Sequence, residues 1–176
     1  MENIFSNLDL LSVGVVVAST AIFGFVVFFN NTQSVTNRAF LFFSLVTSLW
    51  SIANYPSYRL TSETAFWFLR ATLFLAVWHA FSFFMLVYIF PNEYVKFPRW
   101  ITYVLLPVAV VTATLCLSPL IISGIAEFSP DGRIFRFTTG PAMPLFGIVI
   151  MSFISAGMIR LYQLMKQPKT DSRKQS

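Results

Sequence analysis

Long apolar stretches separated by short polar breaks dominate the chain. A bilayer core is about 30 Å thick, so a helix that spans it needs roughly 20 mostly apolar residues. The pattern predicts five such helices, at residues 8–29, 38–55, 62–90, 100–120 and 141–162. We therefore expect an all-α integral membrane bundle in which residues 1–165 form the membrane domain. Residues 166–176 are expected to form a basic cytoplasmic tail or a truncated loop.

The segment between the fourth and fifth predicted helices is too polar to span a membrane. Ser129-Pro130-Asp131-Gly132 is typical of a tight turn, because Pro fixes φ, Asp bonds its own backbone and Gly accepts positive φ. Apolar and basic residues then alternate from Arg133 to Phe137, which is the spacing of a strand. We predict a short extracytoplasmic β-hairpin over residues 121–138. Its favoured role is a cap over the helix ends, and the alternative is part of an external ligand surface.

Composition excludes most soluble classes of protein. Of the 176 residues, 56% are hydrophobic and 11% are charged, whereas a soluble domain is about 25% charged. Cys116 is the single cysteine, so the chain has neither a disulfide framework nor a cysteine-based metal site.

The positions of the basic residues predict an orientation. Cytoplasmic segments of membrane proteins carry an excess of Lys and Arg. With the N-terminus outside, 8 basic residues fall on the cytoplasmic side: Arg38, Lys96, Arg99, Arg160, Lys166, Lys169, Arg173 and Lys174. Only 3 fall outside: Arg59, Arg133 and Arg136. We expect a cell-membrane protein with its N-terminus outside and its C-terminus in the cytoplasm. The basic residues on the cytoplasmic side would then attract anionic lipid headgroups. Because the charges are split among several loops, we expect no nucleic-acid partner.

Small hydroxyl side chains form a stripe along the second predicted helix. Ser44, Thr47, Ser48 and Ser51 follow the i, i+3, i+4, i+7 spacing of one helical face. We expect this face to pack against other helices, because small hydroxyl residues permit close approach there. The lining of a polar pocket is the alternative.

Two ionisable residues lie within the third predicted helix, where such groups are costly and often functional. Arg70 and His79 are nine residues apart, or about 900° of helix, so they point to opposite faces. For Arg70 we weigh an anchor to headgroups or another helix against a functional role. For His79 we weigh a hydrogen bond to a neighbouring helix against a proton or ligand switch.

The candidate ligand-binding residues are Asn54, Arg70, Trp78 and His79. No catalytic constellation, metal-ligand spacing or cofactor motif appears in the sequence, so we do not expect an enzyme, a metal site or a bound cofactor.

Several runs resemble the N-terminal seven-helix membrane region of bacterial sensor histidine kinases. Asn37–Leu45 and Ser48–Asn54 resemble that family's second helix, and Phe66–Arg70 resembles the opening of its third. Tyr88–Pro91 and the hairpin followed by Gly140-Pro141 continue the match. The resemblance covers most of the chain, but the family has two further helices. A fragment, a truncated gene product and a five-helix variant are the three interpretations of that difference.

The resemblance implies a membrane sensor or input domain of a bacterial signal-transduction protein, non-catalytic by itself because no kinase module is present. Its expected partners are the lipid bilayer, a cytoplasmic signalling module or another membrane subunit, and an unknown small ligand. The alternative function is a small membrane transporter or an accessory subunit of a membrane complex.

Overall fold

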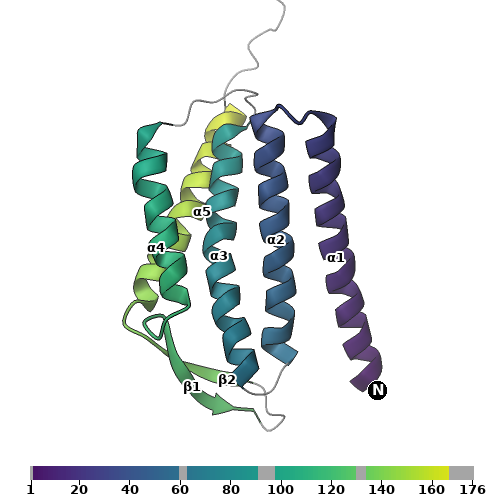
Figure 1. Cartoon of the computed structure of the whole chain (residues 1–176), viewed down its shortest axis with the longest axis vertical. Helices are drawn as coiled ribbons and strands as arrows, with labels where there is room; N and C mark the ends of the chain where they lie inside the picture. The colour runs from purple at the N-terminus through teal and green to yellow at the C-terminus, as the bar shows by residue number, and fades with distance from the viewer. Residues whose placement is uncertain (1, 60–62, 91–97, 130–133, 167–176) are drawn as a thin grey trace, which may run out of the picture.

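An antiparallel bundle of helices with a small hairpin at one end makes up the molecule (Figure 1). The computed structural model describes residues 2–59, 63–90, 98–129 and 134–166. The long helices are α1 (Glu2–Asn30), α2 (Val35–Arg59), α3 (Glu63–Ile89) and α5 (Met143–Lys166). A π-helical turn, η1 (Ile101–Leu105), leads directly into α4 (Leu106–Cys116). The hairpin consists of β1 (Ile122–Phe128) and β2 (Ile134–Thr139).

Within the described ranges, four helices are long and apolar enough to cross a bilayer: Leu8–Asn30, Val35–Ser57, Thr64–Ile89 and Met143–Lys166. These four correspond to the first, second, third and fifth predicted helices. The predicted helical bundle with a hairpin is therefore confirmed, with four helices of spanning length rather than five.

The fourth helix is shorter than the predicted 100–120. The apolar helical segment runs over Ile101–Cys116, about 24 Å at 1.5 Å per residue. It ends because Ser118 precedes Pro119, and the residue before a proline disfavours helical geometry. The last N–H groups instead close tight turns, as Leu117 N–H donates to Thr114 O at 3.1 Å.

Two prolines lie inside helices, and the structure accommodates each differently. Pro107 has no N–H to donate, and the π-helical turn η1 lies immediately before it, with Leu106 N–H donating to Ile101 O. The second helix was predicted to end at residue 55, but α2 continues through Pro56 to Arg59. The Ser57 hydroxyl donates to Asn54 O at 2.6 Å and helps to close this last turn.

The hairpin is confirmed, and its base is part of the core. β1 and β2 pair antiparallel, with Ile122 opposite Thr139 and Ile125 opposite Phe137. Ile121 and Ile122 are fully buried, and Gly140 N–H donates to Ile121 O at 2.8 Å. A Cβ on Gly140 would lie 2.1 Å from Leu120 O, so only glycine fits there. The predicted turn at 129–132 falls mostly outside the described residues.

The apolar core lies between α3, α4 and α5. α3 contributes Val77, Ala80, Phe81 and Phe84, while α4 contributes Ala109 and Ala113 and α5 contributes Val149 and Phe153. The Phe153 ring lies 5.6 Å from that of Phe81 and 6.2 Å from that of Phe84. α3 therefore lies at the centre of the bundle, with α2 packed on its other side.

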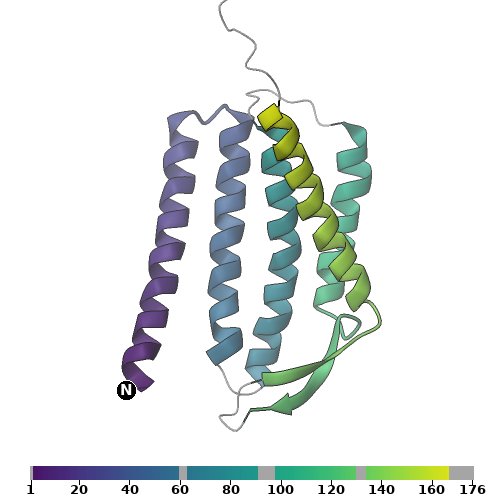
Figure 2. The same ribbon diagram turned by 180° about the vertical axis from the view of Figure 1, so that it is seen from behind.

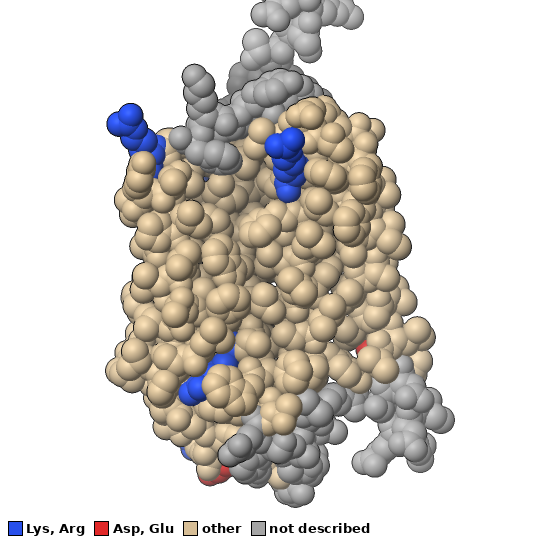
Figure 3. Space-filling view, viewed as in Figure 1, with Lys and Arg blue, Asp and Glu red and all other residues tan. Residues whose placement is uncertain are grey.

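The two ends of the bundle differ. The start of α1 lies at the hairpin end, and the last turn of α5 lies at the opposite end (Figures 1 and 2). Figure 3 shows Lys and Arg near both ends of the visible face and a wide band without charge between them. Arg38, Arg99 and Lys166 belong to helix ends on the side of the bundle opposite the hairpin. The predicted tail, Lys96, Arg133 and the basic residues beyond Lys166 lie outside the described residues.

Helix α1 packs mainly against α2, and the contact depends on a glycine. Gly24 is buried, and a Cβ at this position would lie 2.7 Å from the Ser44 Cβ. Close approach of this kind is typical of small residues between apolar helices.

Gly24→Val is expected to force α1 away from α2. Overpacking of a close contact costs about 1–3 kcal/mol, or roughly 3–10 °C in Tm for a chain of this size. Gly14→Val is the matched control, since nothing lies within 4 Å of a Cβ there. Thermal unfolding in detergent checks the prediction, and equal Tm values for the two variants would contradict it.

Candidate functional site

The hydroxyl stripe of α2 faces its neighbours, as predicted. Ser44 and Ser48 are buried, with 1% and 7% of their surface exposed, and Ser44 meets Gly24 of α1. Thr47 contacts His79 of α3, and Ser51 lines a cavity between α1 and α2. Ser44, Thr47 and Ser48 therefore pack against other helices, as expected. Ser51 instead lines a pocket, which was the alternative.

His79 makes its contacts with α2. Its Nδ1 lies 3.3 Å from Thr47 Oγ1, and its ring lies 5.2 Å from Phe43 and 5.6 Å from Trp50. The Thr47 hydroxyl donates its hydrogen to Phe43 O at 2.8 Å. The Thr47 oxygen can therefore only accept from His79, which requires the tautomer with hydrogen on Nδ1. This contact agrees with the first interpretation of His79, a hydrogen bond to a neighbouring helix.

A cavity of about 320 Å³ opens between α1 and α2. Its walls are Asp9, Ser12 and Val13 of α1, with Trp50, Ser51, Asn54 and Tyr55 of α2. The cavity lies toward the hairpin end, because these residues stand near the start of α1 and the end of α2 (Figure 1). Trp50 connects two parts of the site, since it lines the cavity and also packs against the ring of His79.

One polar atom at this cavity lacks a protein partner. Trp50 Nε1 is buried and has no hydrogen-bond partner among the described residues. A buried donor without an acceptor costs about 1–3 kcal/mol. An acceptor on a bound molecule would remove that cost.

Arg70 lies on another side of α3 and connects α3 to the hairpin. It is 7% exposed; its Nη2 donates to Ile122 O at 2.9 Å and its Nη1 to Leu117 O at 3.4 Å. The guanidinium carbon stands 4.4 Å from the ring centre of Phe66. A planar guanidinium suits this arrangement, because it can donate to two carbonyls and stack on a ring at once. These contacts match the interhelical-anchor interpretation of Arg70.

Trp78 belongs to the apolar core and makes no ring contact with His79. Its ring lies 6.5 Å from Phe74 and 6.0 Å from Phe81, both in edge geometry. Of the four predicted site residues, the structure therefore brings Asn54 and His79 together through Trp50. Arg70 and Trp78 lie elsewhere on α3. Across the described ranges, no three His, Cys, Asp or Glu side chains gather to hold a metal ion.

Asp9, Trp50 and Tyr55 line the cavity but were not predicted as site residues. The helical spacing of Trp50 and Asn54 was a usable signal, because residues four apart share a face. Asp9 carried no such signal, since its place in the site depends on the packing of α1 against α2.

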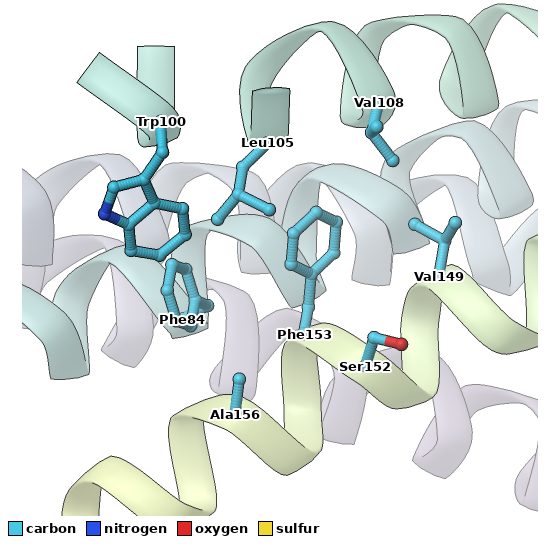
Figure 4. A pocket seen from close by; sticks show the side chains of 8 residues that line it. All are labelled: Phe84, Trp100, Leu105, Val108, Val149, Ser152, Phe153 and Ala156. Atoms are coloured by element: carbon cyan, nitrogen blue, oxygen red, sulfur yellow. The ribbon is translucent and has the colours of Figure 1, made fainter. Parts of the chain in front are cut away.

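A second cavity, of about 260 Å³, lies between α3, α4 and α5 and is almost entirely apolar (Figure 4). Phe84 and Phe153 line its interior, and Trp100 stands beside Phe84 (Figure 4). Among the described residues that line it, Ser152 and the Trp100 indole are the polar ones, and the Ser152 hydroxyl donates to Ile148 O at 2.7 Å. This cavity offers volume to an apolar group but few polar contacts to orient it.

Comparison with known proteins finds no family model, no curated protein and no solved structure that matches this chain. The site must therefore be interpreted from its own geometry.

Arg70→Met is expected to detach the hairpin base from α3. The substitution keeps an apolar stem but leaves two carbonyls without their charged donor, which costs about 2–4 kcal/mol or roughly 4–12 °C in Tm. Arg70→Lys keeps the charge without the planar fork and should fall between Met and wild type. Arg136→Met is the control, because Arg136 is an exposed residue of β2. A melting temperature for Arg70→Met equal to that of Arg136→Met would contradict this role.

His79 is expected to carry its hydrogen on Nδ1. Thr47→Val keeps the shape of the side chain but removes the acceptor, so it should shift the ring toward the other tautomer. Ring ¹⁵N chemical shifts of the labelled histidine, by solid-state NMR in lipid, distinguish the two forms. Thr114→Val is the control, since that hydroxyl donates to Val110 O in its own helix. Nitrogen shifts that do not move in Thr47→Val would contradict the hydrogen bond.

Proposed function

We propose that this chain is a multi-pass membrane sensor or input domain of a bacterial signal-transduction protein, without catalytic activity of its own. Four apolar helices of spanning length support residence in a membrane. The resemblance of α2 and α3 to the membrane region of sensor histidine kinases supports the signalling role. The observation that carries the proposal is a continuous series of side-chain contacts from the α1–α2 cavity to α5.

This series runs through the aromatic residues of α2 and α3. Trp50, in the cavity wall, packs against His79, whose ring also meets Phe43. Phe43 lies 6.4 Å from Phe83, ring to ring. Phe83 reaches α5 at Gly157, where a Cβ would lie 2.7 Å from Phe83 Cε1. A shift of the side chains that line the cavity could therefore move α5 through this series of packed side chains.

The proposed orientation places the hairpin end of the bundle outside the membrane and the opposite end in the cytoplasm. The hairpin and the cavity face outward, and the last turn of α5 faces the cytoplasm. The sequence assigns 8 basic residues to the predicted cytoplasmic segments and 3 to the outer ones, and this excess supports the orientation. A stimulus that reaches the cavity from outside would then be transmitted by α5 to a cytoplasmic signalling module.

A fusion protein tests the proposal. The full chain is joined through its C-terminal end to the phospho-acceptor and ATP-binding modules of a bacterial histidine kinase, and autophosphorylation is measured in nanodiscs. Gly157→Leu pushes α5 from Phe83, so it should change autophosphorylation by roughly 2- to 30-fold, the range of coupling energies of 0.5–2 kcal/mol. Gly147→Leu is the matched control in the same helix, because nothing lies within 4 Å of a Cβ there.

Thermal unfolding first establishes that both variants are folded. If folded Gly157→Leu and Gly147→Leu fusions have the same autophosphorylation rate as the wild-type fusion, α5 does not transmit a signal and the proposal is wrong.

A further inference from the structure

The apolar cavity between α3, α4 and α5 opens toward the outside of the bundle. Its inner wall is buried, since Phe84 and Phe153 have 5% and 4% of their surface exposed. Its outer lining is exposed, with Trp100 at 47% and Val108 at 39%. An apolar cavity of about 150 Å³ can take up benzene, so the volume of about 260 Å³ found here suits a longer apolar group. In a bilayer, the groups beside such an opening are lipid acyl chains.

One end of this cavity has the side chains that suit the level of lipid headgroups. Trp100 and Ala156 stand at this end, and the indole nitrogen of Trp100 is on the side away from Phe153 (Figure 4). The ring of Tyr88 meets that of Trp100 at 6.2 Å between centres. Trp and Tyr side chains favour the boundary between acyl chains and headgroups. A lipid whose chain enters the cavity would therefore have its headgroup at this end, which is opposite the hairpin.

A basic residue follows the cavity lining on α5. Arg160 comes four residues after Ala156 and seven after Phe153, so the three share one face of the helix. Helical side chains lean toward the N-terminus of their helix, so Arg160 leans back toward the turn that contains Ala156. Its Nε is buried and has no hydrogen-bond partner among the described residues. A buried donor without an acceptor is costly, so this atom favours a bound acceptor.

Charge is distributed unevenly between the two ends of the bundle. The acidic residues in the described ranges all belong to elements at the hairpin end: Glu2, Asp9, Glu63 and Glu127. The charged residues described at the opposite end are all basic: Arg38, Arg99, Arg160 and Lys166. In the part of the chain that the structure describes, no carboxylate therefore lies at the end where Arg160 stands.

We infer that one anionic phospholipid binds at this place, with an acyl chain in the apolar cavity and its phosphate beside Arg160. A guanidinium matches the geometry of phosphate oxygens, and the basic residues at this end disfavour the added ammonium of a zwitterionic headgroup. General attraction between basic segments and a membrane acts on many lipids, whereas this site holds a single one. The inference goes beyond the proposed function, because binding needs no signalling output. Failure of the fusion experiment and failure of lipid binding are therefore separate results.

Native mass spectrometry of the full chain in detergent tests the inference. The probes are phosphatidylglycerol and phosphatidylcholine with the same acyl chains, added in equal amounts. The chain should retain one phosphatidylglycerol, at least about fivefold more than phosphatidylcholine, which is the factor for the 1 kcal/mol that a basic residue contributes near a membrane surface. Equal retention of the two lipids, or a graded series of adducts in which no single lipid persists, would overturn the inference.

A pair of charge variants locates the headgroup. Arg160→Met keeps an apolar stem and should lower the preference for phosphatidylglycerol about fivefold, to near equality with phosphatidylcholine. Lys166→Met is the matched control at the same end of α5, because Lys166 lies about 600° of helix further on and its Nζ stands 4.5 Å from the ring centre of Tyr162. This control should keep the wild-type preference. A wild-type preference in folded Arg160→Met, or an equal loss in both variants, would overturn the inference.

A second pair of variants locates the acyl chain. Ala156→Leu fills part of the cavity and should lower the retention of both lipids about fivefold or more, because the added side chain and the acyl chain compete for one space. Ser155→Leu is the matched control, since Ser155 is exposed and is not among the described lining residues. Thermal unfolding checks that each variant is folded, and Arg160→Met decides if Ala156→Leu does not fold. Wild-type retention in folded Ala156→Leu would overturn the inference.

Discussion

Helix α3 contacts α2, α4, α5 and β1. The positions of several of these elements depend on hydrogen bonds that the polar side chains of α3 make. A polar group inside an apolar bundle is costly unless it is hydrogen-bonded. Arg70 meets that requirement with carbonyls at the end of α4 and the start of β1, and His79 meets it with Thr47 of α2. Apolar residues of the same helix, such as Phe81, pack against α5. One helix thus fixes the hairpin, the second helix and the core.

Much of this arrangement could be predicted from the sequence, because helical period and bilayer thickness are strong constraints. Apolar length located the helices, and the turn residues around Pro130 located the hairpin. The nine-residue separation of Arg70 and His79 correctly placed them on different sides of α3. The inward-facing hydroxyl stripe around Thr47 followed from its spacing alone. These are local properties, and each needs only the geometry of one element.

The features that could not be predicted depend on two elements meeting. Helical period shows which residues share a face but not which helix lies opposite, so Asp9 and Asn54 gave no sign that they line one cavity. Trp78 is adjacent to His79 in sequence, yet a rotation of about 100° per residue directs it into the core. Two prolines also could not be interpreted from the sequence alone: α4 ends before Pro119, whereas α2 continues through Pro56. A proline can end a helix or be accommodated, and its neighbours decide which occurs.

The attachment of α1 has a mechanical consequence. This helix packs mainly against one neighbour, α2, and has a close contact with it at Gly24, well away from the cavity, which lies nearer the start of α1. A helix with one main neighbour has fewer contacts that resist tilting, and a long apolar helix in a bilayer tilts when the bilayer becomes thinner. Because α1 supplies one wall of the cavity, a tilt of this helix would change how wide the cavity opens. In a bilayer, a change of lipid thickness that tilts α1 would therefore also change the width of the cavity.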